Sequence, residues 1–201
     1  MCPMRAWPSR GYTLIEVMLA LSLSFFTISA VYSLYTHEIK AQVLREDVVN
    51  MQQQVRVVID LMSREIMMAG YDPRGVNRDN VSTNDFTSIT YDPEKLSIKS
   101  DLNGNGIIGD VNESVIYVFD EGTHLLKRNT GGGNQPFGEN IESFIIKYFD
   151  RAGNPTSNSK DIQQVLISVT ARTSHADPQY AKHQGYRTIT LHSRITLRNG
   201  R

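Results

Sequence analysis

The chain reads Arg10-Gly11-Tyr12-Thr13-Leu14-Ile15-Glu16 near its start, and residues 17–37 that follow contain no Asp, Glu, Lys or Arg. At about 1.5 Å of rise per residue, a helix over those residues is about 31 Å long, which matches the hydrocarbon core of a bilayer. We therefore predict a membrane-spanning helix over residues 12–37. Glu16 lies at its outer edge. An acidic side chain is costly to place in hydrocarbon, so Glu16 is a candidate functional residue.

This region resembles the start of the prepilin family, which comprises the type IV pilins and the pseudopilins of type II secretion. The resemblance is carried by a short leader with two arginines, a glycine, a Thr-Leu-Ile-Glu string and an apolar helix, in that order: Arg5, Arg10, Gly11, Thr13-Leu14-Ile15-Glu16 and residues 17–37. It implies that a prepilin peptidase removes residues 1–11 by cutting after Gly11. It also implies that Tyr12 becomes the methylated N-terminus and that Glu16 serves in assembly.

The alternative interpretation is an ordinary signal-anchor, in which Gly11 and Glu16 are incidental. A plain anchor gains nothing from a glutamate at that position. A cleaved secretory signal also fits poorly, because such signals place their apolar core before the cut and lose it. Here the expected cut comes before the apolar core, so the helix stays in the mature chain.

Composition limits the remaining function classes. The chain has 201 residues with 21 basic and 21 acidic side chains, and without Arg5 and Arg10 of the leader 19 basic residues remain against 21 acidic ones. This balance gives no basic patch and no reason to expect nucleic-acid binding. The single cysteine is Cys2, in the leader. The mature chain is therefore expected to have no disulfide, no thiolate metal site and no cysteine nucleophile.

The helix is predicted to continue beyond the membrane, over residues 38–70, as an amphipathic segment. Its apolar residues recur every three to five positions, which is the 3.6-residue period of a helix with one apolar stripe. The stripe consists of Ile39, Val43, Val48, Met51, Val55, Ile59, Met62 and Ile66. No Pro or Gly interrupts residues 12–69, and Gly70 and Asp72-Pro73 then supply a stop signal. The stripe needs a partner, most simply a sheet of the same chain.

Residues 71–201 have the pattern of a β domain. Short strands are predicted at residues 88–91, 96–99, 114–119, 125–128, 141–149, 164–172 and 187–198, with loops over 76–87 and 129–138. The last two strands alternate apolar and polar residues, which indicates half-buried antiparallel strands. The predicted fold class is α+β, with a long N-terminal helix packed on one antiparallel sheet.

More of the chain resembles the PilW-type minor pilins within the same family. The segments concerned are Arg64-Glu65-Ile66-Met67-Met68-Ala69-Gly70-Tyr71, Gly131-Gly132-Gly133-Asn134-Gln135-Pro136, Glu139-Asn140-Ile141-Glu142-Ser143-Phe144 and Leu197-Arg198-Asn199. Many major pilins carry a proline near the middle of the membrane segment, where this chain has Ser33. That difference favours a minor pilin or a pseudopilin over the bulk subunit.

A calcium site is predicted in the loop over residues 101–113. Oxygen-bearing side chains at its first, third and fifth positions, with a glycine at the sixth, match the start of a calcium loop. Asn112 stands where an EF-hand has its bidentate glutamate, and strands flank the loop, so this is not an EF-hand. The candidate ligands are Asp101, Asn103, Asn105, the Ile107 carbonyl, Asp110 and Glu113. The alternative is an Asn- and Gly-rich hairpin loop whose residues tolerate left-handed dihedrals.

Nothing in the sequence indicates an enzyme. The five histidines show no i, i+4 pair, and no G-x-S-x-G nucleophile motif occurs. The Gly131-Gly132-Gly133 run lacks the Gly-Lys-Ser/Thr of a phosphate loop.

The expected function is that of a minor pilin, a non-enzymatic subunit of a type IV pilus that takes part in its assembly. Its expected partners are other pilins, the prepilin peptidase and the bacterial inner membrane. The chain is expected to cross that membrane once, with its C-terminal domain in the periplasm, before it joins the filament. Two alternatives remain: a J-type pseudopilin of a type II secretion system, and a membrane-anchored, calcium-dependent adhesin that never polymerises.

Overall fold

The computed structural model describes residues 11–79, 83 and 85–199. The expected leader, with Cys2, Arg5 and Arg10, lies outside the described residues except for Gly11. The chain forms two compact units, one ending at Arg45 and the other beginning at Glu46. Each unit is described by itself.

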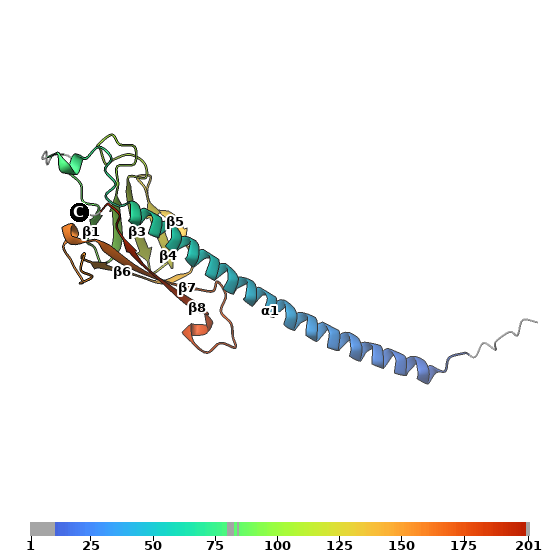
Figure 1. The fold of residues 1–201 in the computed structure, drawn as a ribbon. Helices are drawn as coiled ribbons and strands as arrows, with labels where there is room; N and C mark the ends of the chain where they lie inside the picture. The colour runs from blue at the N-terminus through green and yellow to red at the C-terminus, as the bar shows by residue number, and fades with distance from the viewer. Residues whose placement is uncertain (1–10, 80–82, 84, 200–201) are drawn as a thin grey trace, which may run out of the picture. The chain divides into compact units, whose positions relative to one another are not determined.

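One helix, α1 (Leu14–Met68), runs through 55 residues without interruption (Figure 1). The predicted long N-terminal helix is therefore confirmed. The helix ends at Met68, and Gly70, two residues later, has a left-handed φ of +74°. A Cβ at this position would lie 3.1 Å from the carbonyl oxygen of Asn199. Glycine both adopts this dihedral at low cost and leaves room for the neighbouring chain.

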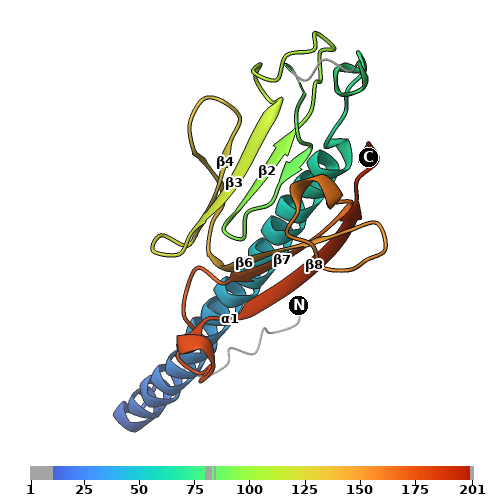
Figure 2. The ribbon, with the colours of Figure 1, turned by 90° about the vertical axis from the view of Figure 1, so that its left-hand side faces the viewer.

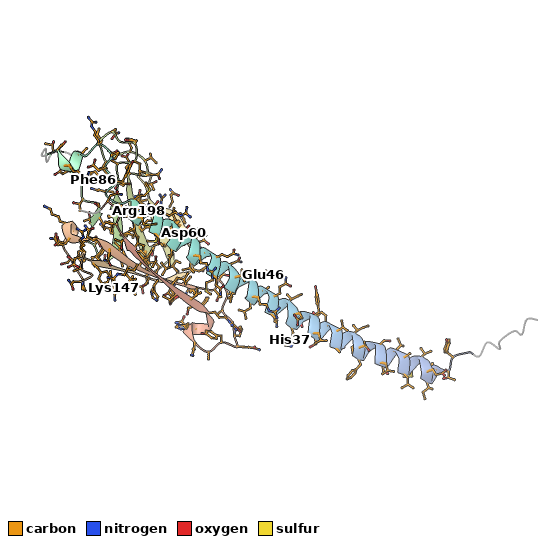
Figure 3. The ribbon with its side chains drawn as sticks, in the orientation of Figure 1. His37, Glu46, Asp60, Phe86, Lys147 and Arg198 are labelled. Atoms are coloured by element: carbon orange, nitrogen blue, oxygen red, sulfur yellow. The ribbon has the colours of Figure 1, made fainter. Side chains whose placement is uncertain are left out.

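The first unit holds the apolar part of α1. Its best 18-residue window has a mean hydropathy of 2.1, and none of the window is buried. By length and composition this helix can cross a membrane. The hydroxyls of Ser24, Thr27 and Ser29 donate to carbonyls one turn earlier, at 2.8–2.9 Å. Because these polar groups are satisfied within the helix, they add little to the cost of placing it in lipid. Figure 3 shows the side chains along this segment.

The second unit contains two antiparallel sheets. Sheet A has the order β1 (Ile89–Thr90), β2 (Lys95–Lys99), β3 (Ser114–Asp120), β4 (Leu125–Asn129) and β5 (Gln135–Gly138). Sheet B has the order β6 (Ile141–Phe149), β7 (Gln164–Arg172) and β8 (Thr188–Thr196). The α+β class and the antiparallel pairing are confirmed. The strands divide between two sheets instead of the one that was predicted (Figure 2).

One predicted loop contains a strand. Residues 129–138 were expected to form a flexible connection, yet β5 pairs with β4 inside that range. Pro136 gives β5 a poor strand signal, although an edge strand can hold a proline because its outer side needs no N–H. Gly138 allows close packing of the strand against the helix, since a Cβ there would lie 3.1 Å from a methyl group of Val58 on α1.

The core of the second unit lies between α1 and the two sheets. The helix contributes Met51, Val55, Val58, Met62 and Ile66, all at most 5% exposed. They join one cluster with residues of both sheets, including Leu96, Tyr117, Leu126, Val165, Ile167 and Val169. Of the predicted stripe, Ile39 and Val43 in the first unit are 42% and 46% exposed. The stripe is therefore covered from Val48 onward and open before it.

Candidate functional site

The predicted processing and assembly residues lie at the start of α1. Gly11 and Tyr12 precede the helix, and the Tyr12 side chain is 89% exposed. Glu16 lies in the first turn of the helix. The peptide bond between Gly11 and Tyr12 is thus outside regular structure, where a peptidase can reach a backbone most easily.

Thr13 and Glu16 form a reciprocal helix cap. The Thr13 backbone N–H donates to Glu16 Oε2 at 2.9 Å, and the Thr13 hydroxyl donates to the same oxygen at 3.0 Å. In return, the Glu16 N–H donates to Thr13 Oγ1 at 3.3 Å. This is a capping box, which satisfies two N–H groups that a helix start otherwise leaves without a partner. Sequence reasoning assigned Glu16 to assembly alone and missed this second role, although the Thr-x-x-Glu spacing signals it.

The cap uses only one side of the Glu16 carboxylate. Both bonds from Thr13 end on Oε2. Within the described residues, Oε1 accepts no hydrogen bond. A carboxylate has about four lone-pair sites, so Glu16 can hold its own helix start and still accept a donor from another chain.

The loop over residues 101–113 is organised by two buried carboxylates. Asp101 is 0% exposed and Glu113 is 1% exposed. Asp101 accepts the backbone N–H groups of Gly104 and Gly106 at 2.7 and 2.9 Å. Glu113 accepts three more backbone N–H groups, those of Leu102, Asn103 and Asp110, at 3.1–3.3 Å. These bonds offset the cost of burying the two carboxylates and hold the loop backbone in place.

Three other predicted calcium ligands meet at the side of this loop. The side-chain amides of Asn103 and Asn105 donate to Asp110 Oδ2 at 2.7 and 2.8 Å. Among the described residues, however, no three His, Cys, Asp or Glu side chains are grouped so that they could hold a metal ion. The structure thus brings Asn103, Asn105 and Asp110 together. It directs Asp101 and Glu113 at backbone N–H groups.

A polar network joins α1 to sheet A. Glu65 accepts a 2.5 Å hydrogen bond from the Tyr117 hydroxyl, and its other oxygen is 2.5 Å from the Arg128 guanidinium. The Glu65 and Arg128 side chains are 17% and 23% exposed. Burial of the phenol, and then its bond to Glu65, raise the pKa of Tyr117. No local sequence pattern predicts this network, because it connects residues more than 50 positions apart.

A second polar contact ties the β7–β8 connection to α1. Asp47 accepts the Ser174 hydroxyl at 2.8 Å and lies 2.8 Å from Nδ1 of His175. Burial acts to raise the pKa of Asp47, but the hydrogen bonds from Ser174 and His175 outweigh it and hold that pKa below its ordinary value. Asp47 therefore fixes the position of this connection beside the helix in the second unit.

Of the comparisons with known proteins, the search of solved structures found matches. A scan against models of protein families gave no match, and a search of the curated proteins also gave none. Among solved structures, the chain is similar to a type IV-like pilin from Thermus thermophilus. The identity is 10% and the TM-score 0.46, over 75% of this chain and 98% of that one.

Proposed function

We propose that the chain is a minor pilin, a non-enzymatic structural subunit of a type IV pilus that acts in assembly of the filament. One observation carries the proposal. The helix α1 is unbroken. Its large apolar side chains from Leu14 to Tyr35 are exposed, whereas its apolar stripe from Met51 to Ile66 is covered by the chain's own sheets. Such a helix is attached to a folded domain at one end and needs other molecules to cover the other.

The size of the open apolar surface supports this need. Large apolar side chains from Leu14 to Tyr35 are 47–81% exposed. Removing one such side chain from water is worth about 1.5–3 kcal/mol, so leaving this many in water is strongly unfavourable. The proposed cover is the bacterial inner membrane before assembly and the equivalent helices of other pilins afterwards.

The proposed orientation places the C-terminal domain in the periplasm. Arg5 and Arg10 come immediately before the apolar segment, and basic residues next to a membrane helix favour the cytoplasmic side. Cleavage after Gly11 by the prepilin peptidase would leave Tyr12 as a methylated N-terminus. The amine of Tyr12 on a neighbouring subunit is the proposed donor to Glu16, with Oε1 as its acceptor. Because desolvation offsets most of the attraction between two buried charges, the proposed role of this pair is to set the register between helices.

Incorporation into surface filaments tests this function. Filaments sheared from cells are separated from the membrane fraction, and the chain is detected in each. The proposal predicts the wild-type chain in both fractions and the Glu16→Ala variant in the membrane alone. A chain that reaches no filament but copurifies with a secretion complex would favour the J-type pseudopilin. If Glu16→Ala enters filaments as well as wild type, the register role is wrong.

We also propose that the loop over residues 101–113 takes up calcium. The proposal rests on the convergence of Asn103 and Asn105 on Asp110, with the buried carboxylates of Asp101 and Glu113 in the same loop. Irregular sets of oxygen ligands suit calcium better than magnesium. Binding requires the side-chain amides of Asn103 and Asn105 to rotate, so that their oxygens and not their N–H groups face an ion beside Asp110. Asp101, Glu113 and the Ile107 carbonyl are the remaining proposed ligands.

Thermal unfolding of the full chain in detergent tests the calcium proposal. A ligand that binds only the folded state raises the melting temperature by mass action. We expect calcium to raise it, magnesium to raise it less, and Asp110→Asn to abolish the effect. Asp85→Asn, at an exposed position outside the loop, is the matched control and should respond as wild type does. An unchanged melting temperature in calcium would show that the carboxylates only hold the loop. A chain that binds calcium and keeps residues 1–11 would favour the non-polymerising adhesin.

A further inference from the structure

Among the described residues, no strand pairs with the outer edge of β8 in sheet B. On its other side, β8 pairs with β7 in continuous register from Gln164↔Thr196 to Arg172↔Thr188. Just beyond the two ends of β8, Thr173 donates its N–H to the Arg187 carbonyl and Leu197 donates to the Gln163 carbonyl, each at 2.9 Å. In an antiparallel ladder, backbone groups alternate between the two sides of a strand. The odd-numbered residues of β8 therefore bond to β7, and the even-numbered ones present N–H and C=O groups to the open edge.

The other sheet edges carry features that discourage strand pairing, and β8 does not. In sheet A, β1 has two residues and β5 has four, including a proline. In sheet B, β6 has a register shift near its start, and at its far end Pro155 forms a bridge with Phe149. By contrast, β8 has nine residues, no proline and no shift. Its core-facing side chains are uncharged: Ile189, Leu191, Ser193 and Ile195. Long, regular edges of this kind are ready to accept another strand.

A groove adjoins the start of this edge. Its volume is about 280 Å³. One part of its lining is apolar, with Val48 and Met51 of α1, Tyr180, and Ile189 of β8, and the other part is polar, with Gln52, Arg187 and Thr188. Ile189 and Leu191 pack against the core but are only half-buried. A strand added beside β8 would direct every second side chain toward α1, and near Ile189 that side chain would enter the groove. The apolar part of the lining, with Val48, Met51 and Ile189, thus favours an apolar residue at this position of the added strand.

The outer face of sheet B is basic at its open edge, where β8 carries Arg194 and no acidic residue. Arg172 of β7 and Lys147 of β6, which is labelled in Figure 3, lie on the same face but farther from this edge. The only acidic residue in the three strands is Glu142, which is paired with Arg172 at 3.3 Å. Opposite charges on neighbouring strands stabilise their pairing, and like charges destabilise it. The side chains of the added strand that point to the outer face of sheet B should therefore be acidic.

We propose that β8 binds an extended segment of another protein by strand addition, and that this segment alternates apolar residues with Asp or Glu. A second copy of β8 is a poor occupant, because pairing of two copies would set His192 and Arg194 beside the basic face of the partner copy. The inference is independent of assembly through α1, since it uses only residues of the second unit.

A synthetic peptide tests the proposal on the full chain in neutral detergent micelles. The probe is a fluorescent nine-residue peptide of alternating Val and Glu, and the control peptide has Lys in place of Glu. Thr190 is even-numbered, so Thr190→Pro removes an N–H from the open edge without removing a bond to β7. Thr190→Val is the matched control, because it loses the same hydroxyl, which lies 2.9 Å from that of Thr170, but keeps the N–H.

We expect saturable binding of the Glu peptide to wild type and to Thr190→Val. Binding to Thr190→Pro should be roughly tenfold weaker, the effect of one lost backbone hydrogen bond. The Lys peptide should bind more weakly than the Glu peptide to wild type. Equal melting temperatures of the two variants would show that both are folded. The proposal is overturned if the Glu peptide does not bind, or if Thr190→Pro binds it as well as Thr190→Val does. Dimers of wild type that disappear in Thr190→Pro would instead make a second copy the occupant.

Discussion

Glu16 accepts hydrogen bonds from both the backbone N–H and the hydroxyl of Thr13, so the acidic residue at the edge of the apolar helix also caps that helix. The cap and the proposed contact with a neighbouring Tyr12 use different oxygens of one carboxylate. The cap occupies Oε2 and leaves Oε1 for a contact between subunits. Because the two roles use different atoms, substitutions can separate them.

Thr13→Ala should weaken the helix cap but not assembly, and Glu16→Gln should prevent assembly but not weaken the cap. Thr13→Ala removes the cap hydroxyl at a cost of about 1 kcal/mol to the helix start but keeps the charge. Glu16→Gln keeps an oxygen that can accept from Thr13 but removes the charge. We expect Thr13→Ala to fray the first turn, measured by amide hydrogen exchange, and still to enter filaments. Glu16→Gln should keep the turn and fail to enter. If Glu16→Gln enters filaments and Thr13→Ala does not, Glu16 acts in assembly only as a cap.

Adjacent valines on α1 should differ sharply in their importance for stability. Val58 is 1% exposed and Val57 is 63% exposed. Val58→Ala leaves a cavity between the helix and the sheets and should cost roughly 2 kcal/mol of unfolding free energy. Val57→Ala removes an exposed side chain and replaces a β-branched residue with the best helix former, so it should change little. Denaturant unfolding of the full chain in detergent measures both. Equal costs would contradict the described packing of α1.

Two ion pairs of α1 should also differ in their contribution to stability. Removing Glu65 leaves the partly buried Arg128 and the Tyr117 hydroxyl without their partner, so Glu65→Ala should cost roughly 2 kcal/mol or more. The pair between Asp60 and Arg64 is exposed, with both side chains more than 60% accessible, so Asp60→Ala should cost about 0.5 kcal/mol or less. Figure 3 labels Asp60. The same unfolding measurement tests both variants, and a large loss for Asp60→Ala would mean that exposed charges dominate.

Stability should fall at alkaline pH because of two buried tyrosines. The pKa values of Tyr117 and Tyr148 are raised above 10.0, mainly by burial. The unfolded chain then loses these protons near pH 10 while the folded chain keeps them. Their contribution is full below pH 10 and declines as the pH rises further.

Tyr117→Phe removes one of these two groups. Its unfolding free energy should decline less steeply than that of wild type between about pH 9 and pH 11. At neutral pH it should be about 1 kcal/mol less stable, because the bond to Glu65 is lost. An alkaline decline identical to that of wild type would show that Tyr117 does not contribute to the pH dependence.

Periodic patterns were enough to predict most elements of this fold. The strands β7 and β8 alternate apolar and polar residues along their length, and α1 keeps a 3.6-residue stripe. The strand β5 was missed because Pro136 and the preceding glycines are typical of a loop. Its pairing with β4 depends on the folded structure and not on a local pattern. The division into two sheets was missed for a similar reason. Alternation shows which residues face the core, but it does not show which strand lies beside which.

The candidate sites were predictable to different degrees. The string from Gly11 to Glu16 is local, so residue order alone indicated it. The capping box is also local, and the Thr-x-x-Glu spacing indicates it, although it was not predicted. The contact of Glu65 with Tyr117 and Arg128 joins distant segments, so no local pattern could indicate it. In the loop over residues 101–113 the sequence shows which side chains carry oxygen atoms, but the direction of each side chain depends on the fold.

Mass spectrometry of the N-terminus of the native protein, isolated from its own cells, shows whether the chain is processed as proposed. We expect a mature chain that begins at Tyr12 and carries a methyl group on its amine, which would place Glu16 in the first turn of a processed, lipid-exposed helix. A native protein that still begins at Met1 and retains residues 1–11 would contradict the proposed processing.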